Sequence, residues 1–208
     1  MIMYRKHIKR VIDIIFSTVA LVVLSPLLII LALLIVLNMG APVLFKQERI
    51  GKDEKIFIMY KFRSMNSKKD SEGNLLPDSQ RVTMFGKILR GSSLDELPEL
   101  INILKGDISI IGPRPLLVDY LPYYTDFERQ RHKIRGGLTV PEVLYDNLTP
   151  TWEEQFKYEI DYINNISFLL DLKIVIKTVS GVFKRGSHGY GSYVRRSLIE
   201  EREGRENA

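Results

Sequence analysis

The feature that most constrains this chain is an apolar run near its N-terminus. Residues 14–45 carry no charged side chain, and residues 19–37 are almost wholly aliphatic. A helix of that length is long enough to cross the hydrocarbon core of a bilayer. The run is too long for a cleaved signal peptide, and no small-residue cleavage site follows it. We therefore predict that the chain is held at a membrane.

Basic residues flank this run on both sides. They are Arg5, Lys6, Lys9 and Arg10 before it, and Lys46, Arg49 and Lys52 after it. Because the positive-inside rule then prefers neither end, both ends are expected on the cytoplasmic side. Asp13, between Arg10 and the apolar run, is expected to pair with a basic neighbour.

A proline divides the run near its middle, at Ser25-Pro26. Proline removes one hydrogen bond of a helix, and a serine hydroxyl can satisfy the carbonyl that is freed. A helix that bends at Ser25 and Pro26 and returns to the leaflet from which it entered would satisfy both observations. On these residues alone, an ordinary single-pass anchor with a proline kink is the alternative.

The remaining composition limits the chemistry. The net charge of +5 favours an anionic partner, such as a lipid headgroup, a phosphorylated substrate or a nucleic acid. The chain has no cysteine, which excludes disulfides and thiolate nucleophiles. Its three histidines, His7, His132 and His188, are scattered, so any metal is expected to be a hard cation with oxygen ligands.

Two adjacent carboxylates, Asp95 and Glu96, lie where a short helix is expected to begin. Residues 97–104 are apolar at helical spacing, and Gly106 is a plausible stop. Ser93 and Glu96 also match a capping box, but that register would put Pro98 inside the helix. A start nearer Asp95 is favoured, and it would place Asp95 at the positive end of the helix.

Cationic side chains surround this segment in the sequence. Residues 43–45 and 56–65 read as two strands joined by a turn at 51–53, and the second strand alternates Lys61 and Arg63 on one face. Arg90 leads into the carboxylate pair. Arg114 is held between two prolines, which fixes the backbone around a guanidinium suited to phosphate.

The C-terminal third contains two helical patterns, at 152–163 and 168–183, and the second is amphipathic. An aromatic stripe at 117–127, followed by cations at 129–135, suits either a membrane interface or packing on the core. A nucleic-acid surface is not favoured, because stacking aromatic residues are not interleaved with the cations. Residues 195–208 are highly charged and expected to be frayed.

Five motifs in order resemble the monotopic phosphoglycosyltransferases, the bacterial polyprenyl-phosphate sugar-phosphate transferases that begin glycan assembly. These motifs are Ser25-Pro26, Gln47-Glu48-Arg49-Ile50-Gly51, Met59-Tyr60-Lys61-Phe62-Arg63, Leu94-Asp95-Glu96-Leu97-Pro98 and Gly112-Pro113-Arg114-Pro115. The resemblance runs from about residue 9 to about residue 177. It is to the small members, which are little more than the catalytic domain.

The resemblance implies a re-entrant membrane helix broken at Ser25-Pro26. It implies a nucleophilic Asp95, with Glu96 beside it and Mg²⁺ held by both. It also implies a nucleotide-sugar donor, expected to be a UDP-sugar, and a polyprenyl phosphate acceptor, with UMP released and downstream glycosyltransferases as possible partners. The residues expected to bind substrate are Lys61, Arg63, Arg90, Arg114 and Asp161. The catalytic domain would lie on the cytoplasmic face of the bacterial inner membrane. Residues 136–142, Gly-Gly-Leu-Thr-Val-Pro-Glu, depart from the family's pattern at a place that bears on donor preference.

The predicted architecture is a mainly α, monotopic membrane protein with a small β element and interfacial amphipathic helices. Residues 1–41 form the re-entrant helix with its basic flank, residues 42–194 the catalytic domain, and residues 195–208 a disordered tail. Two rival functions remain: a non-catalytic membrane-surface adaptor that binds anionic lipid or a partner protein, and a hydrolase of nucleotide sugars.

Overall fold

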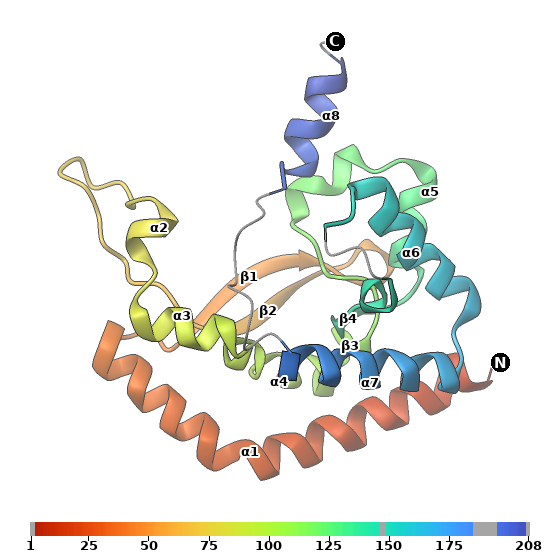
Figure 1. Ribbon diagram of the computed structural model, residues 1–208, viewed down its shortest axis with the longest axis horizontal. Helices are drawn as coiled ribbons and strands as arrows, with labels where there is room; N and C mark the ends of the chain where they lie inside the picture. Colours follow the sequence, from red (N-terminus) through yellow and green to blue (C-terminus); the bar gives the residue numbers. More distant parts are fainter. Residues whose placement is uncertain (1–2, 146–148, 185–194, 207–208) are drawn as a thin grey trace.

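The computed structural model describes residues 3–145, 149–184 and 195–206 (Figure 1). The N-terminal half contains η1 (Tyr4–Ile8), α1 (Lys9–Met39), β1 (Leu44–Ile50), η2 (Lys52–Glu54), β2 (Ile56–Phe62), α2 (Asp78–Arg81), α3 (Met84–Gly91), η3 (Leu94–Glu96) and α4 (Glu99–Lys105). The C-terminal half contains β3 (Ile108–Ile111), η4 (Val118–Tyr123), α5 (Asp126–Arg129), η5 (Gln130–Lys133), β4 (Gly136–Thr139), η6 (Pro141–Leu144), α6 (Trp152–Asn165), α7 (Phe168–Lys184) and α8 (Leu198–Glu206). The prediction of a mainly α protein with a small β element is confirmed.

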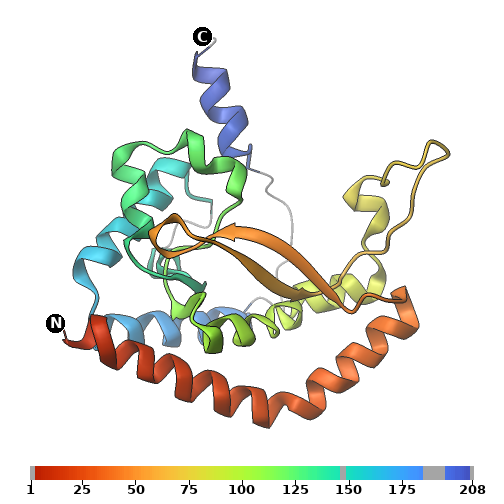
Figure 2. The same cartoon turned by 180° about the vertical axis from the view of Figure 1, so that it is seen from behind.

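Helix α1 bends near its middle instead of breaking. It runs through Ser25 and Pro26 without interruption, which corrects the expected broken helix. Pro26 has no N–H for the carbonyl of Val22, and the Ser25 hydroxyl donates to that carbonyl at 2.8 Å. Figures 1 and 2 show both ends of α1 turned toward the rest of the protein. The serine therefore makes the compensating bond that the sequence predicts.

The inner face of α1 packs on the rest of the protein along both arms. Ala20, Leu21 and Leu24 meet a buried cluster that includes Leu100 and Ile103 of α4. Farther along α1, Leu31 and Ile35 are buried in a cluster with Phe62 of β2 and Leu89 of α3. The bent helix is thus part of the fold and not a separate appendage.

The outer face of α1 is exposed and apolar. Only 11% of its most apolar 18-residue window is buried, and Leu37 is 80% exposed. A core helix of a soluble protein would bury such residues, whereas a helix in lipid would not. α1 is long and apolar enough to be a membrane anchor.

Helices α3, α4 and α7 lie in one row along the concave side of α1 (Figure 1), and they also expose apolar side chains. These side chains are Met84 and Ile88 on α3, Ile101 and Leu104 on α4, and Phe168, Leu169, Leu172, Ile176 and Val179 on α7. We call this row with the outer face of α1 the apolar platform. The predicted helix at 168–183 is confirmed by α7.

The β element consists of two small sheets. β1 and β2 form an antiparallel hairpin in which Leu44 is opposite Phe62 and Ile50 is opposite Ile56. β3 and β4 pair in parallel. The hairpin and its turn were predicted, but β2 ends at Phe62 and not at residue 65, so Arg63 lies beyond the strand.

Polar contacts fasten the first arm of α1. The buried Asp13 carboxylate accepts hydrogen bonds from the Ser109 hydroxyl and the Ile110 N–H, both at 3.0 Å. Arg10 donates to the carbonyls of Ile103 and Leu104 at the end of α4. The expectation that Asp13 forms an ion pair with a basic neighbour is therefore wrong. Its partners lie on β3.

The aromatic stripe of residues 117–127 belongs mainly to the core. Tyr120 and Tyr124 are buried with Trp152 and Phe156 of α6 and with Leu198 of α8. This arrangement settles the two alternatives for the stripe in favour of core packing. It also corrects the predicted frayed tail, because an apolar residue at position 198 reaches the core and residues 198–206 are helical.

Asp13→Ala tests the link between α1 and β3. The substitution leaves the Ser109 hydroxyl and the Ile110 N–H without their acceptor, so we expect the free energy of unfolding to fall by about 1–3 kcal/mol. Denaturant unfolding in detergent micelles measures this change. The matched control, Asp119→Ala, removes an exposed carboxylate and should change it by less than about 0.5 kcal/mol. Equal effects of the two variants would contradict the proposed link.

Candidate active site

The candidate site lies where the end of β2 meets η3 and α4. The Lys61 ammonium contacts the Glu96 carboxylate at 2.8 Å and the Glu99 carboxylate at 3.1 Å. Asn102 fixes the same junction, since its side chain accepts from the N–H of Tyr60 at 3.0 Å and donates to the carbonyl of Ile58 at 2.7 Å. The strand that carries Lys61 is thereby tied to the helix that follows the two carboxylates.

Asp95 and Glu96 lie in the 3₁₀ turn η3, one turn ahead of α4. Ser93 precedes the turn with a φ of 55° and makes no capping hydrogen bond, so the capping box is absent. α4 begins at Glu99 with Pro98 as its N-cap and ends at Gly106. The predicted helix stop is confirmed, but the helix starts later than predicted, with Pro98 at the N-cap, where its missing N–H costs α4 no hydrogen bond.

Opposing electrostatic effects act on the carboxylate of Asp95. Its pKa is raised, first by burial and then by the neighbouring Glu96, while Lys61, its own backbone N–H and Arg90 act in the opposite direction. Arg90 is oriented by a 2.8 Å hydrogen bond from its Nε to the Ser64 hydroxyl. Among the residues that the structure describes, no side chain forms a hydrogen bond or ion pair with Asp95. The site therefore contains a carboxylate that no described cation pairs with directly.

Glu99 is a buried acid on the far side of Lys61. Burial raises its pKa to about 7, against the opposing effect of Lys61. Burial also disfavours the charged form of Lys61, but Glu99 and Glu96 outweigh this effect and the pKa of Lys61 is raised overall. Lys61 is consequently a fixed positive charge at this site.

Arg114 faces the same cluster from the loop after β3. It is exposed, and it lies close enough to lower the pKa of Glu99 and of Arg49, whose pKa is lowered mainly by burial. Two guanidinium groups close together and near a buried carboxylate are suited to a multiply charged anion. A buried contact also fixes the backbone of Arg114, in addition to the two flanking prolines.

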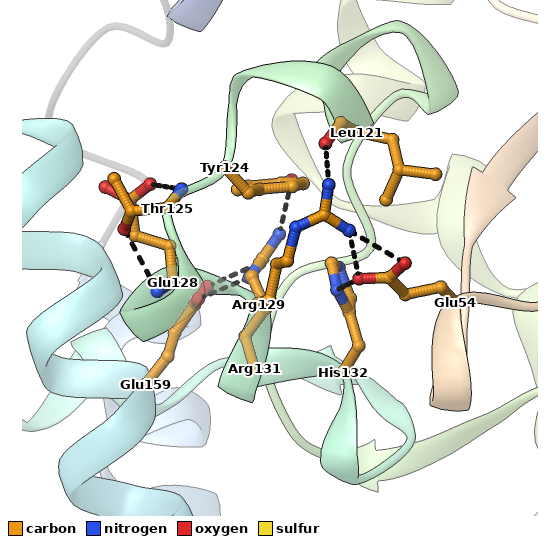
Figure 3. A network of polar contacts seen from close by, with 9 residues as sticks. All are labelled: Glu54, Leu121, Tyr124, Thr125, Glu128, Arg129, Arg131, His132 and Glu159. Atoms are coloured by element: carbon orange, nitrogen blue, oxygen red, sulfur yellow. Dashed lines mark hydrogen bonds and ion pairs between the residues drawn. The ribbon is translucent and has the colours of Figure 1, made fainter.

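That contact is made by a buried ion pair between η5 and α6 (Figure 3). Arg131 contacts Glu159 through its Nε and Nη2 at 2.7 and 2.8 Å, and its Nη1 donates to the Tyr124 hydroxyl at 2.9 Å. The same Nη2 donates to the backbone carbonyl of Arg114 at 2.6 Å. Arg131 thus holds the Pro113–Pro115 loop from below. Of the two alternatives for the segment 117–135, Arg131 supports packing in the core, since its side chain is only 2% exposed.

Two predicted substrate-binding residues lie apart from this cluster. Arg63 is buried and donates to the carbonyls of Met39, Pro42 and Met65, which commits its guanidinium to the end of α1. Asp161 is exposed on α6 and accepts from the Tyr145 hydroxyl and the Asn165 amide. Within the described residues, neither forms a hydrogen bond or ion pair with Asp95, Glu96 or Lys61. The structure brings together Lys61, Arg90, Asp95 and Glu96, and Arg114 acts on Glu99 of the same cluster.

The carboxylate pair fits a magnesium ion. Carboxylate oxygens are the ligands that Mg²⁺ prefers, and burial together with the neighbouring Glu96 raises the pKa of Asp95, so a cation between the two acids would favour its ionised form. The described part of the chain contains no group of three or more metal-binding side chains. An ion held by Asp95 and Glu96 would therefore complete its shell with water and substrate phosphate, as Mg²⁺ commonly does.

The site borders the apolar platform. Leu94 and Leu97, on either side of the carboxylate pair, pack in the cluster formed by the second arm of α1 and α3. Because α1 and α3 also carry exposed apolar side chains, the carboxylates lie at the edge of the surface that would face lipid.

Sequence reasoning missed Glu99, Arg49 and Arg131. A signal for Glu99 was present, because Glu96 and Glu99 are three residues apart and this spacing places two side chains on one face of a helical segment. Arg49 lies within one of the quoted motifs but was not singled out. Arg131 gives no such signal, because its partner Glu159 is distant in sequence.

The fold and this site combine one helix that is long and apolar enough to cross a membrane with a half-buried carboxylate near cations. The family model described as "Bacterial sugar transferase" matches residues 4–185, and the chain belongs to that family. This assignment confirms the resemblance to the polyprenyl-phosphate sugar-phosphate transferases.

Named relatives make the comparison more specific. The chain is 43% identical over 175 residues to the "Uncharacterized sugar transferase EpsL" of Bacillus subtilis, covering 84% of this chain and 87% of that one. It is 39% identical over 180 residues to the UDP-N-acetylgalactosamine-undecaprenyl-phosphate N-acetylgalactosaminephosphotransferase of Aeromonas hydrophila, covering 83% and 43%. It is 37% identical over 182 residues to the UDP-glucose:undecaprenyl-phosphate glucose-1-phosphate transferase of Escherichia coli, covering 83% and 39%. The chain thus spans less than half of the last two relatives.

The pKa of Glu99 predicts a pH-dependent stability. Since the pKa is about 7 in the folded protein and 4.5 as the ordinary value, the folded state binds the proton more tightly. The contribution of the Glu99 proton to the free energy of unfolding is fully present below pH 4.5. It is lost as the pH rises through 7, and the loss is roughly 3 kcal/mol. Unfolding of wild type and Glu99→Gln between pH 5 and pH 8 measures it. The variant should lack this part of the slope, and an unchanged slope would contradict the assignment.

Proposed function

We propose that this protein transfers a sugar phosphate from a UDP-sugar to undecaprenyl phosphate through a covalent intermediate on Asp95. The observation that carries the proposal is the half-buried Asp95 carboxylate at the edge of the apolar platform. It has no hydrogen-bond or ion-pair partner among the described side chains, Lys61 and Arg90 act on it electrostatically, and Arg114 acts on the neighbouring Glu99. The names of two relatives state UDP-sugar donors and an undecaprenyl-phosphate acceptor, which supports these substrate classes.

In the first step, an Asp95 carboxylate oxygen attacks the phosphorus atom that bears the sugar. A new bond forms between that phosphorus and the oxygen of Asp95, and its bond to the oxygen bridging the two phosphorus atoms breaks. The bridging oxygen leaves on UMP with the electron pair of the broken bond. The sugar phosphate is then held as an acyl phosphate on Asp95, which divides the transfer into two displacements.

In the second step, an oxygen of the lipid phosphate attacks the same phosphorus. The bond to Asp95 breaks, the carboxylate is restored, and the product is a polyprenyl diphosphate sugar. No water enters the balance, so the protein must keep water from the acyl phosphate. The apolar side chains of Leu94 and Leu97 beside the nucleophile suit this task, and their packing on α1 puts Asp95 within reach of a lipid-borne phosphate.

Cations make the attack of one anion on another feasible. Lys61 is kept charged by Glu96 and Glu99, and Arg114 is held from behind by Arg131. Lys61 and Arg114 would bind phosphoryl oxygens and stabilise the charge that develops there. Magnesium on Asp95 and Glu96 would supply additional Lewis acidity toward the diphosphate. Glu96 orients Lys61 through their 2.8 Å contact.

The bend in α1 supports re-entrant insertion. At 1.5 Å per residue, the arms before and after Ser25-Pro26 are about 25 Å and about 20 Å long, and each is shorter than the ~30 Å hydrocarbon core. Both arms return to the row formed by α3, α4 and α7 (Figures 1 and 2). The catalytic residues would then lie on the cytoplasmic face of the bacterial inner membrane, with α7 as an interfacial helix.

Replacement of the nucleophile gives the main test. Full-length protein in detergent, with Mg²⁺, undecaprenyl phosphate and a panel of UDP-sugars, should release UMP and form glycolipid, whereas Asp95→Asn should lose at least about 10³-fold of the rate because the amide cannot attack. Mass spectrometry of donor-treated wild type should find the sugar phosphate on Asp95.

The matched control is Asp119→Asn, which neutralises an exposed carboxylate elsewhere and should keep full activity. UMP without a glycolipid product would support the hydrolase alternative. Folded wild-type protein that releases no UMP with any donor would support the membrane-surface adaptor. A phosphorylated side chain other than Asp95 would overturn the proposed nucleophile.

Labelling of introduced cysteines tests the membrane topology. Because the chain has no cysteine of its own, Tyr4→Cys and Lys52→Cys each provide a unique thiol at one end of α1. We expect a membrane-impermeant maleimide to label both only from the cytoplasmic side. Labelling of the two positions from opposite sides would restore the single-pass anchor.

A further inference from the structure

A second charged site lies at the other end of α1. A cavity of about 540 Å³ opens beside the first turns of that helix, and seven of its eleven lining residues are lysine or arginine. Its volume is in the range of ligand pockets, about 300–1,000 Å³. We call it the basic pocket. It shares no residue with the Asp95 cluster.

The basic pocket is assembled from segments far apart in the sequence. Arg5, Lys6 and Arg10 come from η1 and α1, Lys52 comes from η2, Lys133 ends η5, and Arg135 directly precedes β4. The fold positions at least two of them firmly, since Arg10 donates to two carbonyls of α4 and Arg135 donates to the carbonyl of Gly106 at 2.7 Å. Carbonyl partners orient these groups but do not neutralise them.

Carboxylates compensate little of this charge. Lys9 pairs with Asp171, and Lys52 lies 3.7 Å from Asp53 with both side chains well exposed. Among the described residues, no carboxylate forms an ion pair with the other five cations that line the pocket. The one acid in the lining, Asp13, is buried and directs an oxygen at Ser109 and Ile110. The pocket therefore attracts an anion.

The surroundings of the pocket favour an anion with an apolar tail. Ile166, in its wall, is two residues before Phe168, where the exposed apolar face of α7 begins. The Phe168 ring meets the Tyr4 ring edge to face at 6.1 Å, directly beside Arg5. A soluble phosphate would use the cations alone, whereas a lipid would also use this apolar border.

We propose that the basic pocket binds the phosphate headgroup of an anionic phospholipid of the leaflet that α1 enters. The acyl chains would lie along α7 and the first arm of α1, and the headgroup would rest among Lys6, Lys52 and Lys133. The bound lipid would hold the N-terminal arm of α1 at a fixed depth. This inference uses the membrane orientation proposed above, but not the chemistry at Asp95.

The test compares two triple variants of the full-length protein in phosphatidylcholine nanodiscs. Lys6→Gln, Lys52→Gln and Lys133→Gln together remove three exposed lysines of the pocket, and Lys46→Gln, Lys68→Gln and Lys157→Gln together remove three exposed lysines outside it. Both variants change the net charge equally. Spin-labelled phosphatidylglycerol and spin-labelled phosphatidylcholine report the relative association of each lipid with the protein.

We expect wild type to prefer phosphatidylglycerol and the pocket variant to lose at least tenfold of that preference, since each basic residue near a membrane surface contributes about fivefold. The control variant should lose less than twofold. An equal loss in both variants, or no loss in the pocket variant, would overturn the proposal. The measurement needs no turnover, so Asp95→Asn should retain the same preference whatever its activity.

A second arm separates the two sources of phosphate. Inorganic phosphate and glycerol 3-phosphate are titrated calorimetrically into wild type in non-ionic detergent. We expect no binding below millimolar concentration, because neither ligand has the apolar part that the border of the pocket would bury. Submillimolar binding that the pocket variant loses would assign the pocket to a soluble phosphate and overturn the lipid.

Discussion

Packing of the inner face of α1 on α3, α4 and β3 is the interaction on which the rest of the structure depends. The outer face of the helix is too apolar to be stable in water. Its inner face is buried by contacts with the catalytic part of the chain. Those contacts are possible only because the helix bends at Ser25-Pro26. The bend brings both arms against the same side of the protein and leaves a continuous apolar surface on the other.

The candidate active site follows from that arrangement through local charge balance. Glu96 and Glu99 satisfy Lys61, so the remaining acid, Asp95, has no ion-pair partner among the described residues. A fully paired aspartate would be a poor nucleophile, because its charge would be committed to a salt bridge. Here the neighbouring cations act at a distance and the carboxylate remains accessible. The buried Arg131–Glu159 pair lies outside this balance and serves to hold the backbone of Arg114.

The sequence predicted those features that depend on near neighbours. The apolar run, the bend at Ser25-Pro26, the hairpin around Gly51, the stop at Gly106 and the amphipathic helix after residue 168 all have local signals. Contacts between distant segments had none: Asp13 binds β3 instead of a nearby cation, and Arg63 is drawn into the end of α1. The helix at 198–206 was missed because a charged segment can still be anchored by two apolar residues, Leu198 and Ile199, that pack on an existing core. Lys61 and Glu96, which come from two separate motifs, are in contact, and Arg90 acts on Asp95, whereas Asp161 forms hydrogen bonds with Tyr145 and Asn165 instead.

Arg63 has a consequence for the modularity of this protein. Its guanidinium binds the carbonyls of Met39 and Pro42, while its backbone continues directly from the strand that carries Lys61. The end of α1 and the catalytic part are therefore joined by side-chain hydrogen bonds of Arg63 as well as by the chain itself. A soluble fragment that begins after residue 42 would expose Leu89 and Phe62 and leave this arginine buried without two of its acceptors. Unlike a tethered enzyme, this chain cannot be transplanted onto a foreign membrane helix unless the new helix reproduces the carbonyls at its end.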